Sequence, residues 1–210
     1  GISINEYLVS VYIWSVYTEC LHGMPSKCPI RVAVPVNLRP YFNSITTKNF
    51  FVMVSAEFHP TKETYTFAEV AAIVKESLRS QINRENLEKL FSYNVSNEKL
   101  LIARVVPLFL KNLAMKYVYT TSALANTATI TNIGNISVTE EYRPYVEMFH
   151  AFLAMSKGQH LKGTICSYGD TLVFSFSYDL VDASVQRGFF RKIASDGIAV
   201  EIKSNGVNYE

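Results

Sequence analysis

The sequence predicts an α+β fold, in which a mixed, largely antiparallel sheet carries helices packed on one side. Two observations predict it. Segments with helical spacing of apolar residues and segments with strand-like alternation both occur, and they do not follow the strict strand-helix-strand order of a parallel α/β protein. The 210 residues are enough for one domain with a sizeable core. We therefore expect residues 1–210 to form a single domain.

The chain is expected to begin with a buried helix. Ser3 and Glu6 form a capping-box pattern, and the run from Leu8 to Val16 is apolar on nearly all sides. Such a helix must be covered by other elements all round. The apolar opening from Tyr7 to Val16 is shorter than a bilayer span, so it predicts no membrane-spanning segment.

Two strands are expected next, at residues 30–36 and 50–58. Branched apolar residues alternate with other residues in the first run, and the second is rich in aromatic and β-branched residues. Proline cannot donate a hydrogen bond to a neighbouring strand. Pro35 therefore suggests that the first strand lies at an edge or ends nearby.

Helices are expected in the middle of the chain. Thr66 and Glu69 form a second capping box, and apolar residues from Phe67 to Ile82 then follow helical spacing closely. The helical pattern continues through residues 84–122 but is interrupted, most clearly at Pro107. We expect two or three shorter helices there.

The last third of the chain changes to strand character before a final helix. Four runs read as strands: residues 127–133, 146–155, 162–168 and 171–178. Gly169-Asp170 is a suitable two-residue hairpin turn between the last two. The final helix is expected to begin with Asp182 as its N-cap and to end at Gly197. Its buried face is predicted to carry Val185, Phe189 and Ile193.

Composition and charge indicate which partners to expect. Hydrophobic residues make up 49% of the chain and charged residues 18%, which predicts more apolar surface than a lone domain needs. The isolated chain is therefore expected to self-associate. The net charge of +2 comes from interspersed lysines and arginines, so nucleic acid is not an expected partner.

The cysteines and histidines indicate no metal site. The three cysteines stand apart from one another in the sequence, which favours neither a disulfide framework nor zinc and fits a reducing cytoplasm. None of the four histidines has a Cys, Ser or acidic neighbour at a spacing typical of a nucleophile, base or metal ligand. The residues alone therefore predict no catalytic group.

Two motifs in the last third resemble the closing part of the chloramphenicol-acetyltransferase-like superfamily. The first is Thr-Ile-Thr-Asn-Ile-Gly at residues 129–134, which is similar to an SNxG-like strand end. The second is residues 173–183, where a strand leads into a pattern similar to HHxxxDG. On that pattern Ser177 and Tyr178 occupy the two histidine positions and Asp182 the aspartate position. The resemblance thus implies that this chain lacks the catalytic base.

Two-lobe members of the superfamily resemble this chain from its beginning. Their carboxy-terminal lobe opens with an apolar helix and a strand that ends in an NLRP-like turn, as at residues 4–17 and 34–40. Only their amino-terminal lobe keeps HHxxxDG. The resemblance implies that this chain is the carboxy-terminal lobe, and that the lobe with HHxxxDG is absent from it.

The resemblance also implies a reaction and roles for particular residues. The full-length protein is expected to move an acyl group from acyl-CoA, as co-substrate, or from an acyl-carrier thioester to an alcohol or amine, without a metal or a tightly bound cofactor. Asn132, Ile133 and Gly134 are expected to line the acyl channel. Arg39 is expected to form a structural salt bridge with the aspartate of the other lobe.

Several alternatives stay open from the sequence. An alcohol acetyltransferase-like lobe is the first interpretation, and a peptide-synthetase condensation-domain lobe or a scaffolding domain that kept the fold without the chemistry are the alternatives. A single-lobe homotrimeric acyltransferase is a third interpretation, which Tyr178 disfavours because such a trimer needs a histidine there. Arg39 could pair with a local carboxylate, and Asp182 could serve only as an N-cap. Residues 132–134 could form an ordinary turn.

Overall fold

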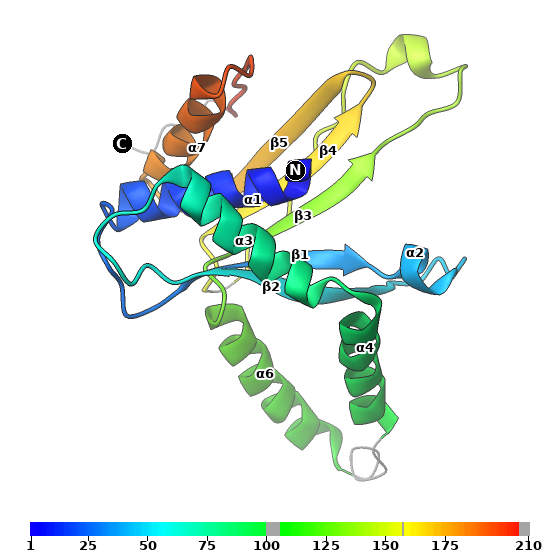
Figure 1. Ribbon diagram of the computed structural model, residues 1–210. Coiled ribbons are helices and arrows are strands. Elements are labelled where there is room, and N and C mark those ends of the chain that lie inside the picture. Colours follow the sequence, from blue (N-terminus) through cyan, green and yellow to red (C-terminus); the bar gives the residue numbers. More distant parts are fainter. Residues whose placement is uncertain (100–105, 157, 206–210) are drawn as a thin grey trace.

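A five-stranded sheet forms the centre of the computed structural model, which describes residues 1–99, 106–156 and 158–205 (Figure 1). The strands lie in the order β2-β1-β3-β4-β5, with bounds β1 Ile30–Asn37, β2 Phe51–Phe58, β3 Ala128–Asn135, β4 Leu161–Tyr168 and β5 Thr171–Tyr178. The β1–β2 and β4–β5 pairs are antiparallel, and β3 runs parallel to both of its neighbours. The predicted mixed sheet is confirmed, and its longest ladders are antiparallel.

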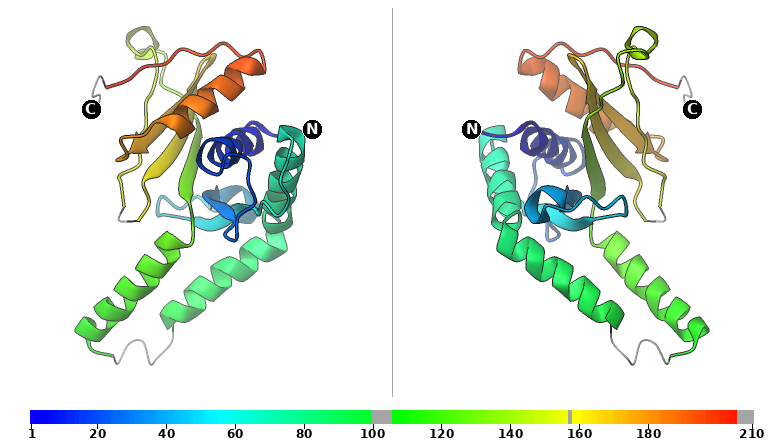
Figure 2. Two further views of the ribbon diagram at one scale, coloured as in Figure 1. Left: turned by 90° about the vertical axis from the view of Figure 1, so that its left-hand side faces the viewer. Right: turned by 90° about the vertical axis from the view of Figure 1, so that its right-hand side faces the viewer.

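Three helices cover one face of this sheet. They are three of the α-helices in the described part of the chain: α1 Ile4–Ser15, α2 Arg39–Phe42, α3 Phe67–Gln81, α4 Arg84–Lys99, α6 Leu108–Leu124 and α7 Ser184–Ser195. A π-helical turn at Val16–Cys20 and a 3-10 turn at Arg143–Tyr145 are also present. Figure 2 shows α1, α3 and α7 together on one side of the strands, as predicted. By contrast, α4 and α6 extend away from the sheet (Figures 1 and 2).

The opening helix is buried all round because it lies between neighbours. α1 contacts α3 on one side, α7 on the other and strand β1 beneath. Val9 and Ile13 lie on one face of the helix and Val11 lies on roughly the opposite face, yet all three are fully buried. The apolar composition of residues 8–16 thus follows from the position of α1 in the middle of the helical layer.

Both predicted capping boxes form, and the first continues into an ion pair between helices. Glu6 Oε2 accepts the Ser3 backbone N–H at 2.7 Å, and Ser3 Oγ accepts the Glu6 N–H at 3.2 Å. Arg79 of α3 donates its Nε–H to Glu6 Oε1 at 2.7 Å. The Arg79 hydrogen bond and those from Ser3 lower the pKa of the Glu6 carboxyl to about 2, although its burial acts in the opposite direction.

Glu6→Gln should lower the free energy of unfolding by about 2 kcal/mol at pH 7, because a nearly buried carboxylate loses its ion pair with the half-exposed Arg79. Folding lowers the pKa of Glu6 from its ordinary 4.5 to about 2. The stabilisation is therefore complete above the unfolded pKa and is lost as the pH falls toward the folded one. Urea unfolding at several pH values should show the difference between the two proteins vanish near the lower pKa. The matched control is Glu85→Gln, which breaks the exposed pair with Lys89 and should change nothing measurable.

Strand β1 changes its surroundings at Ala33. β1 pairs with β3 only at Val32 and Ala33, whereas it pairs with β2 along its whole length. Beyond Ala33 the strand has a neighbour on one side only. Pro35 lies in that part, so its missing N–H leaves no gap in a central ladder. The edge expected from Pro35 is therefore present over this half of the strand.

The strand predicted at residues 146–155 is wrong. These residues cross the sheet face opposite the helices without entering a ladder. Lys162 Nζ donates to the Ala154 carbonyl at 2.7 Å, and Cys166 Sγ donates to the Phe149 carbonyl at 3.2 Å. The side chains do alternate between exposed and partly covered from Phe149 to Met155. The sequence pattern thus reflects one covered side, and pairing fails because no strand lies beside it in the described part of the chain.

The N-cap predicted at Asp182 is also wrong. The structure begins α7 at Ser184 with Ala183 as its N-cap, and Ala183 makes no side-chain capping bond. Asp182 instead accepts the Ser184 backbone N–H at 2.9 Å and the Ser184 hydroxyl at 2.7 Å. The Asp182 carboxylate thus bonds to the first residue of α7 from the position just before the N-cap Ala183. The predicted face of Val185, Phe189 and Ile193 is buried, and Gly197 follows the helix end with φ of 84°.

Candidate functional site

Ser177 and Tyr178 lie at the end of β5 and face opposite sides of the sheet. Tyr178 lies on the side of Phe176, which contacts Phe189 and Phe190 of α7, and it packs against the core. Ser177 pairs with Lys162 of β4 and faces the side without helices. A tyrosine hydroxyl, with an ordinary pKa near 10, is a poor base at neutral pH. These positions therefore offer packing rather than base catalysis.

A histidine and an aspartate meet beside Tyr178, and the sequence interpretation missed this pair. His160 Nδ1 lies 2.9 Å from Asp179 Oδ1, and both side chains are at least half exposed. The expectation that no histidine has an acidic partner is thus wrong for His160. The predicted hairpin contained the signal, because its turn at residues 169–170 places Tyr178 opposite Leu161 and the next residues outward opposite each other. Asp179 orients the imidazole, but water weakens so exposed a pair.

Asp182 is held locally. The two hydrogen bonds from Ser184 lower the pKa of the Asp182 carboxyl. Burial raises the pKa of the nearby Cys20 thiol, with the Asp182 and Glu19 charges adding to this effect. Asp182 therefore stays a carboxylate near the start of α7, where its described contacts stabilise a turn.

Arg39 lies just after β1 and binds the following loop. Its Nε–H donates to the Thr46 carbonyl at 2.9 Å, Nη2 donates to the Lys48 carbonyl at 2.7 Å, and Nη1 donates to Asn37 Oδ1 at 3.2 Å. Outside the side chains of residues 94–99 and 122–124, which are not described, no ion pair joins Arg39 to a carboxylate within residues 1–99, 106–156 and 158–205. The guanidinium has five N–H groups, so two remain, one on each terminal nitrogen.

Asn132, Ile133 and Gly134 form a bulge near the end of β3. The register with β4 shifts between Asn132 and Gly134, and Asn132 Oδ1 accepts the Gly134 N–H at 2.8 Å. Gly134 has φ of 87°, a conformation that favours glycine. The Ile133 side chain is 54% exposed. Residues 132–134 therefore form a hydrogen-bonded bulge that exposes the apolar side chain of Ile133 to solvent.

The structure places two of the predicted sites at one end of the sheet and the third at the other end. β1 and β3 are parallel, so α2, which begins at Arg39, and the end of β3, which contains Gly134, lie at the same end of the sheet; α2 and the end of β3 are to the right in Figure 1. Gly134 pairs with Cys166, which pairs with Val173 near the beginning of β5. Tyr178 lies at the other end of β5. The positions resembling HHxxxDG are therefore at the opposite end of the sheet from the bulge and Arg39.

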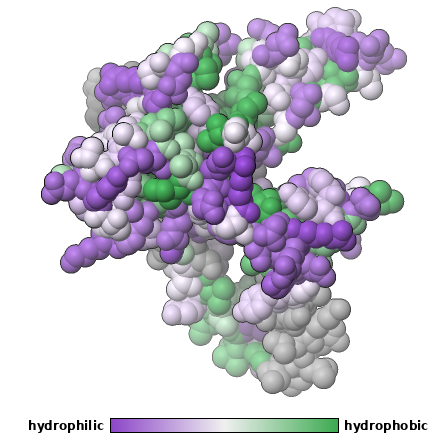
Figure 3. Space-filling model, in the orientation of Figure 1, coloured by the Kyte–Doolittle hydropathy of each residue, from purple (hydrophilic) through white to green (hydrophobic). Residues whose placement is uncertain are grey.

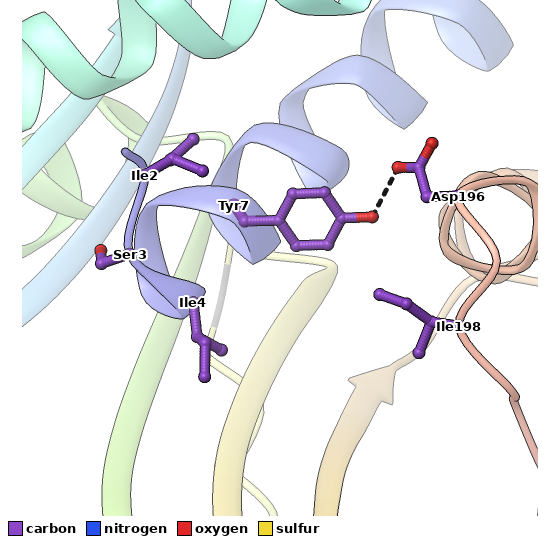
Figure 4. Close-up of a pocket in the computed structure, with 6 residues that line it drawn as sticks. All are labelled: Ile2, Ser3, Ile4, Tyr7, Asp196 and Ile198. Atoms are coloured by element: carbon purple, nitrogen blue, oxygen red, sulfur yellow. Dashed lines mark hydrogen bonds between the residues drawn. The ribbon is translucent and has the colours of Figure 1, made fainter.

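An open hollow lies elsewhere, between the beginning of α1 and the end of α7 (Figure 4). It is open to solvent and apolar, with Ile2, Ile4 and Ile198 around Tyr7. The Tyr7 hydroxyl donates to Asp196 Oδ2 at 2.7 Å, and partial burial, reinforced by Asp196, raises the pKa of Tyr7. This hydrogen bond ties α1 to the end of α7.

The described residues do not assemble a metal site or a membrane span. Over residues 1–99, 106–156 and 158–205 no group of three or more His, Cys, Asp or Glu side chains could hold a metal ion. Within the same ranges no helix has the length and apolar character needed to cross a bilayer.

No protein-family model matches this chain, and no curated protein is similar to it in sequence. Solved structures are similar in fold. The epimerization domain from the third module of tyrocidine synthetase B has a TM-score of 0.52 at 10% identity, covering 92% of this chain and 41% of its own.

Two further structures are similar at lower TM-scores. The wax ester synthase/diacylglycerol acyltransferase from Marinobacter aquaeolei VT8 has a TM-score of 0.47 at 13% identity, covering 94% of this chain and 44% of its own. The condensation domain for chain release from the enacyloxin polyketide synthase has a TM-score of 0.43 at 10% identity, covering 98% and 39%. This chain thus spans about two fifths of each solved structure's length. The likeness to the epimerization domain concerns the fold, and this chain adopts the chloramphenicol-acetyltransferase-like fold that the sequence predicts.

Proposed function

We propose that this chain is the non-catalytic, carboxy-terminal lobe of a two-lobe acyltransferase. The full-length enzyme moves an acyl group from a CoA or carrier-protein thioester to an alcohol or amine, in the manner of an alcohol O-acetyltransferase. The observation that carries the proposal is the combination of this fold with Ser177 and Tyr178 where the superfamily pattern has two histidines. The share of the epimerization domain that this chain covers, 41%, also supports a single lobe.

The reaction needs a base that this chain lacks at the aligned position. The acceptor hydroxyl or amine attacks the thioester carbonyl, a base takes its proton, and the thiolate leaves with the electron pair of the broken C–S bond. In our proposal a histidine of the other lobe is this base. The bulge at residues 132–134 lines the acyl channel, and Arg39 at the same end of the sheet supports the catalytic loop across the lobes.

Two alternatives share the fold. A lobe of a peptide-synthetase condensation domain is supported as well as the alcohol acetyltransferase, because the epimerization domain shares only the fold with this chain. A scaffolding domain without chemistry is the other alternative. An HHxxxDG motif in the same full-length reading frame supports the enzyme, and a reading frame without it supports the scaffold.

The purified chain should show no acyltransferase activity, because the aligned base position is Tyr178. Thiol release from acetyl-CoA, measured with a panel of alcohols and amines, should stay at the buffer rate. His160→Asn and Tyr178→Phe test the two groups at this end of β5. Acceptor-dependent turnover that either substitution abolishes would contradict the proposal, since a base would then lie within this chain.

A further inference from the structure

Residues 146–156, which we call the strap, cross the sheet without joining it. They lie on the face opposite α1, α3 and α7, and in the described part of the chain they form no ladder with a strand. Their only bridge is a local one at the end of the strap, between Ser156 and Gln159. A strand of the same length would be held by a series of backbone hydrogen bonds. The strap therefore depends on side chains for its attachment to the sheet.

Few side-chain hydrogen bonds join the strap to β4. Lys162 Nζ donates to the Ala154 carbonyl at 2.7 Å and to the Ser156 hydroxyl at 2.5 Å. Cys166 Sγ donates to the Phe149 carbonyl at 3.2 Å. A thiol is a weak donor, so the second attachment is weaker than the first. Two residues of β4 thus supply these hydrogen bonds.

The strap also buries little of its own apolar surface. The Phe149 ring contacts the Tyr168 ring edge-on, with 5.3 Å between the ring centroids, and it is half-buried. Phe152 points away and is 67% exposed. A segment with few buried apolar contacts opens locally at a lower free energy than the core around it. Phe149 is therefore the main aromatic contact between the strap and the sheet.

The sheet face under the strap is polar where the opposite face is apolar. Lys162, Thr164 and Ser175, which we call the polar row, lie on the strap side of β4 and β5 and are at most 7% exposed. On the other side of β4, Leu161 and Ile165 pack in the core. There the helices cover the sheet permanently, and Figure 3 shows many hydrophilic side chains on the outer surface of this helical layer.

Water can replace the strap over the polar row at low cost. Hydroxyl and ammonium groups lose hydration when they are buried, whereas apolar side chains gain stability from burial. None of the ion pairs among the described side chains involves Lys162, so no carboxylate compensates its burial there. Detachment of the strap returns the Lys162 ammonium to water. The composition of this face thus favours a cover that opens.

We propose that the strap is a cover that detaches from the sheet as one unit while the strands and helices stay folded. Detachment exposes the ammonium of Lys162 and the hydroxyls of Thr164 and Ser175 on one sheet face. This motion does not depend on the proposed acyl transfer, because it involves only contacts within this chain.

Cys166 reports the opening of the strap, because it is 1% exposed and its thiol bonds to the strap. Cys20 and Cys28 are exposed, so both are first replaced by serine. The rate at which a maleimide labels Cys166, followed by mass spectrometry, then measures opening. Phe149→Ala should raise this rate at least about tenfold, because it removes the ring contact and its apolar burial. Phe152→Ala removes an exposed ring from the same strap and should leave the rate unchanged.

A second comparison separates detachment of the strap from unfolding of the whole chain. Phe189→Ala weakens the core on the other face of the sheet, so it should leave the labelling rate nearly unchanged. Urea below the unfolding transition should also change the rate little, because opening the strap exposes little surface. Labelling that rises in proportion to the unfolding equilibrium, in Phe189→Ala or in urea, would overturn the proposal, since Cys166 would then be reached only by global unfolding. Equal rates in Phe149→Ala and Phe152→Ala would overturn it as well.

Discussion

Replacing Phe189 with alanine should lower the free energy of unfolding by about 3–5 kcal/mol, the usual cost of removing a buried phenyl ring. Phe189 of α7 is fully buried. Its ring centroid lies 4.3 Å from that of Phe174 and 5.2 Å from that of Phe176, both on β5. The side chain is therefore a principal attachment of α7 to the sheet, and urea unfolding followed by circular dichroism should show the loss.

The side chains around Phe189 are packed too tightly to move into the cavity that Phe189→Ala would leave. A Cβ atom on Gly163 would lie 2.7 Å from the Phe174 ring, so this ring packs directly against the backbone of Gly163. The matched control is Phe152→Ala, which removes the same ring from a side chain that is 67% exposed. It should change stability by less than about 0.5 kcal/mol. Equal effects of the two substitutions would show that α7 is not docked through Phe189.

Elements with local signals were predicted well from the sequence. The two capping boxes fixed the beginnings of α1 and α3, because each side chain bonds a backbone group only three residues away. The hairpin of β4 and β5 followed from Gly169-Asp170, and Gly169 has the positive φ that such a turn requires. Pro107 preceded α6 for an equally local reason.

Features that depend on distant parts of the chain were predicted less well. Residues 146–155 have a strand's alternation, but a strand also needs a neighbour, and no pattern within the segment reveals whether one exists. Asp182 has the right chemistry for an N-cap, yet the helix begins two residues later. The His160–Asp179 pair was implicit in the hairpin register and could have been found from it. The resemblance of residues 177 and 178 to two histidine positions did not reveal that the Ser177 and Tyr178 side chains face opposite sides of the sheet.

In the full-length enzyme, Arg39→Ala should lower kcat by about 10²- to 10³-fold, the kinetic equivalent of breaking a buried ion pair. This expectation rests on the proposed two-lobe enzyme. The described contacts prepare Arg39 for the role, because bonds to the Thr46 and Lys48 carbonyls and to Asn37 fix the guanidinium at the end of β1. The two unused N–H groups can then grip a carboxylate of the other lobe, which fixes its angle as well as its distance.

Arg39→Lys should recover little of this activity, because an ammonium cannot hold both loop carbonyls and a carboxylate in one plane. Arg39 is expected to act by positioning the catalytic loop, so kcat should fall in both variants while KM for the thioester changes little. In the isolated chain, Arg39→Ala removes only partly exposed hydrogen bonds and should cost about 1 kcal/mol or less. The test compares the effect of Arg39→Ala on kcat of the full-length enzyme with its effect on the free energy of unfolding of the isolated chain. A large loss of stability in the isolated chain, or full turnover with lysine, would show that Arg39 serves its own loop and not the other lobe.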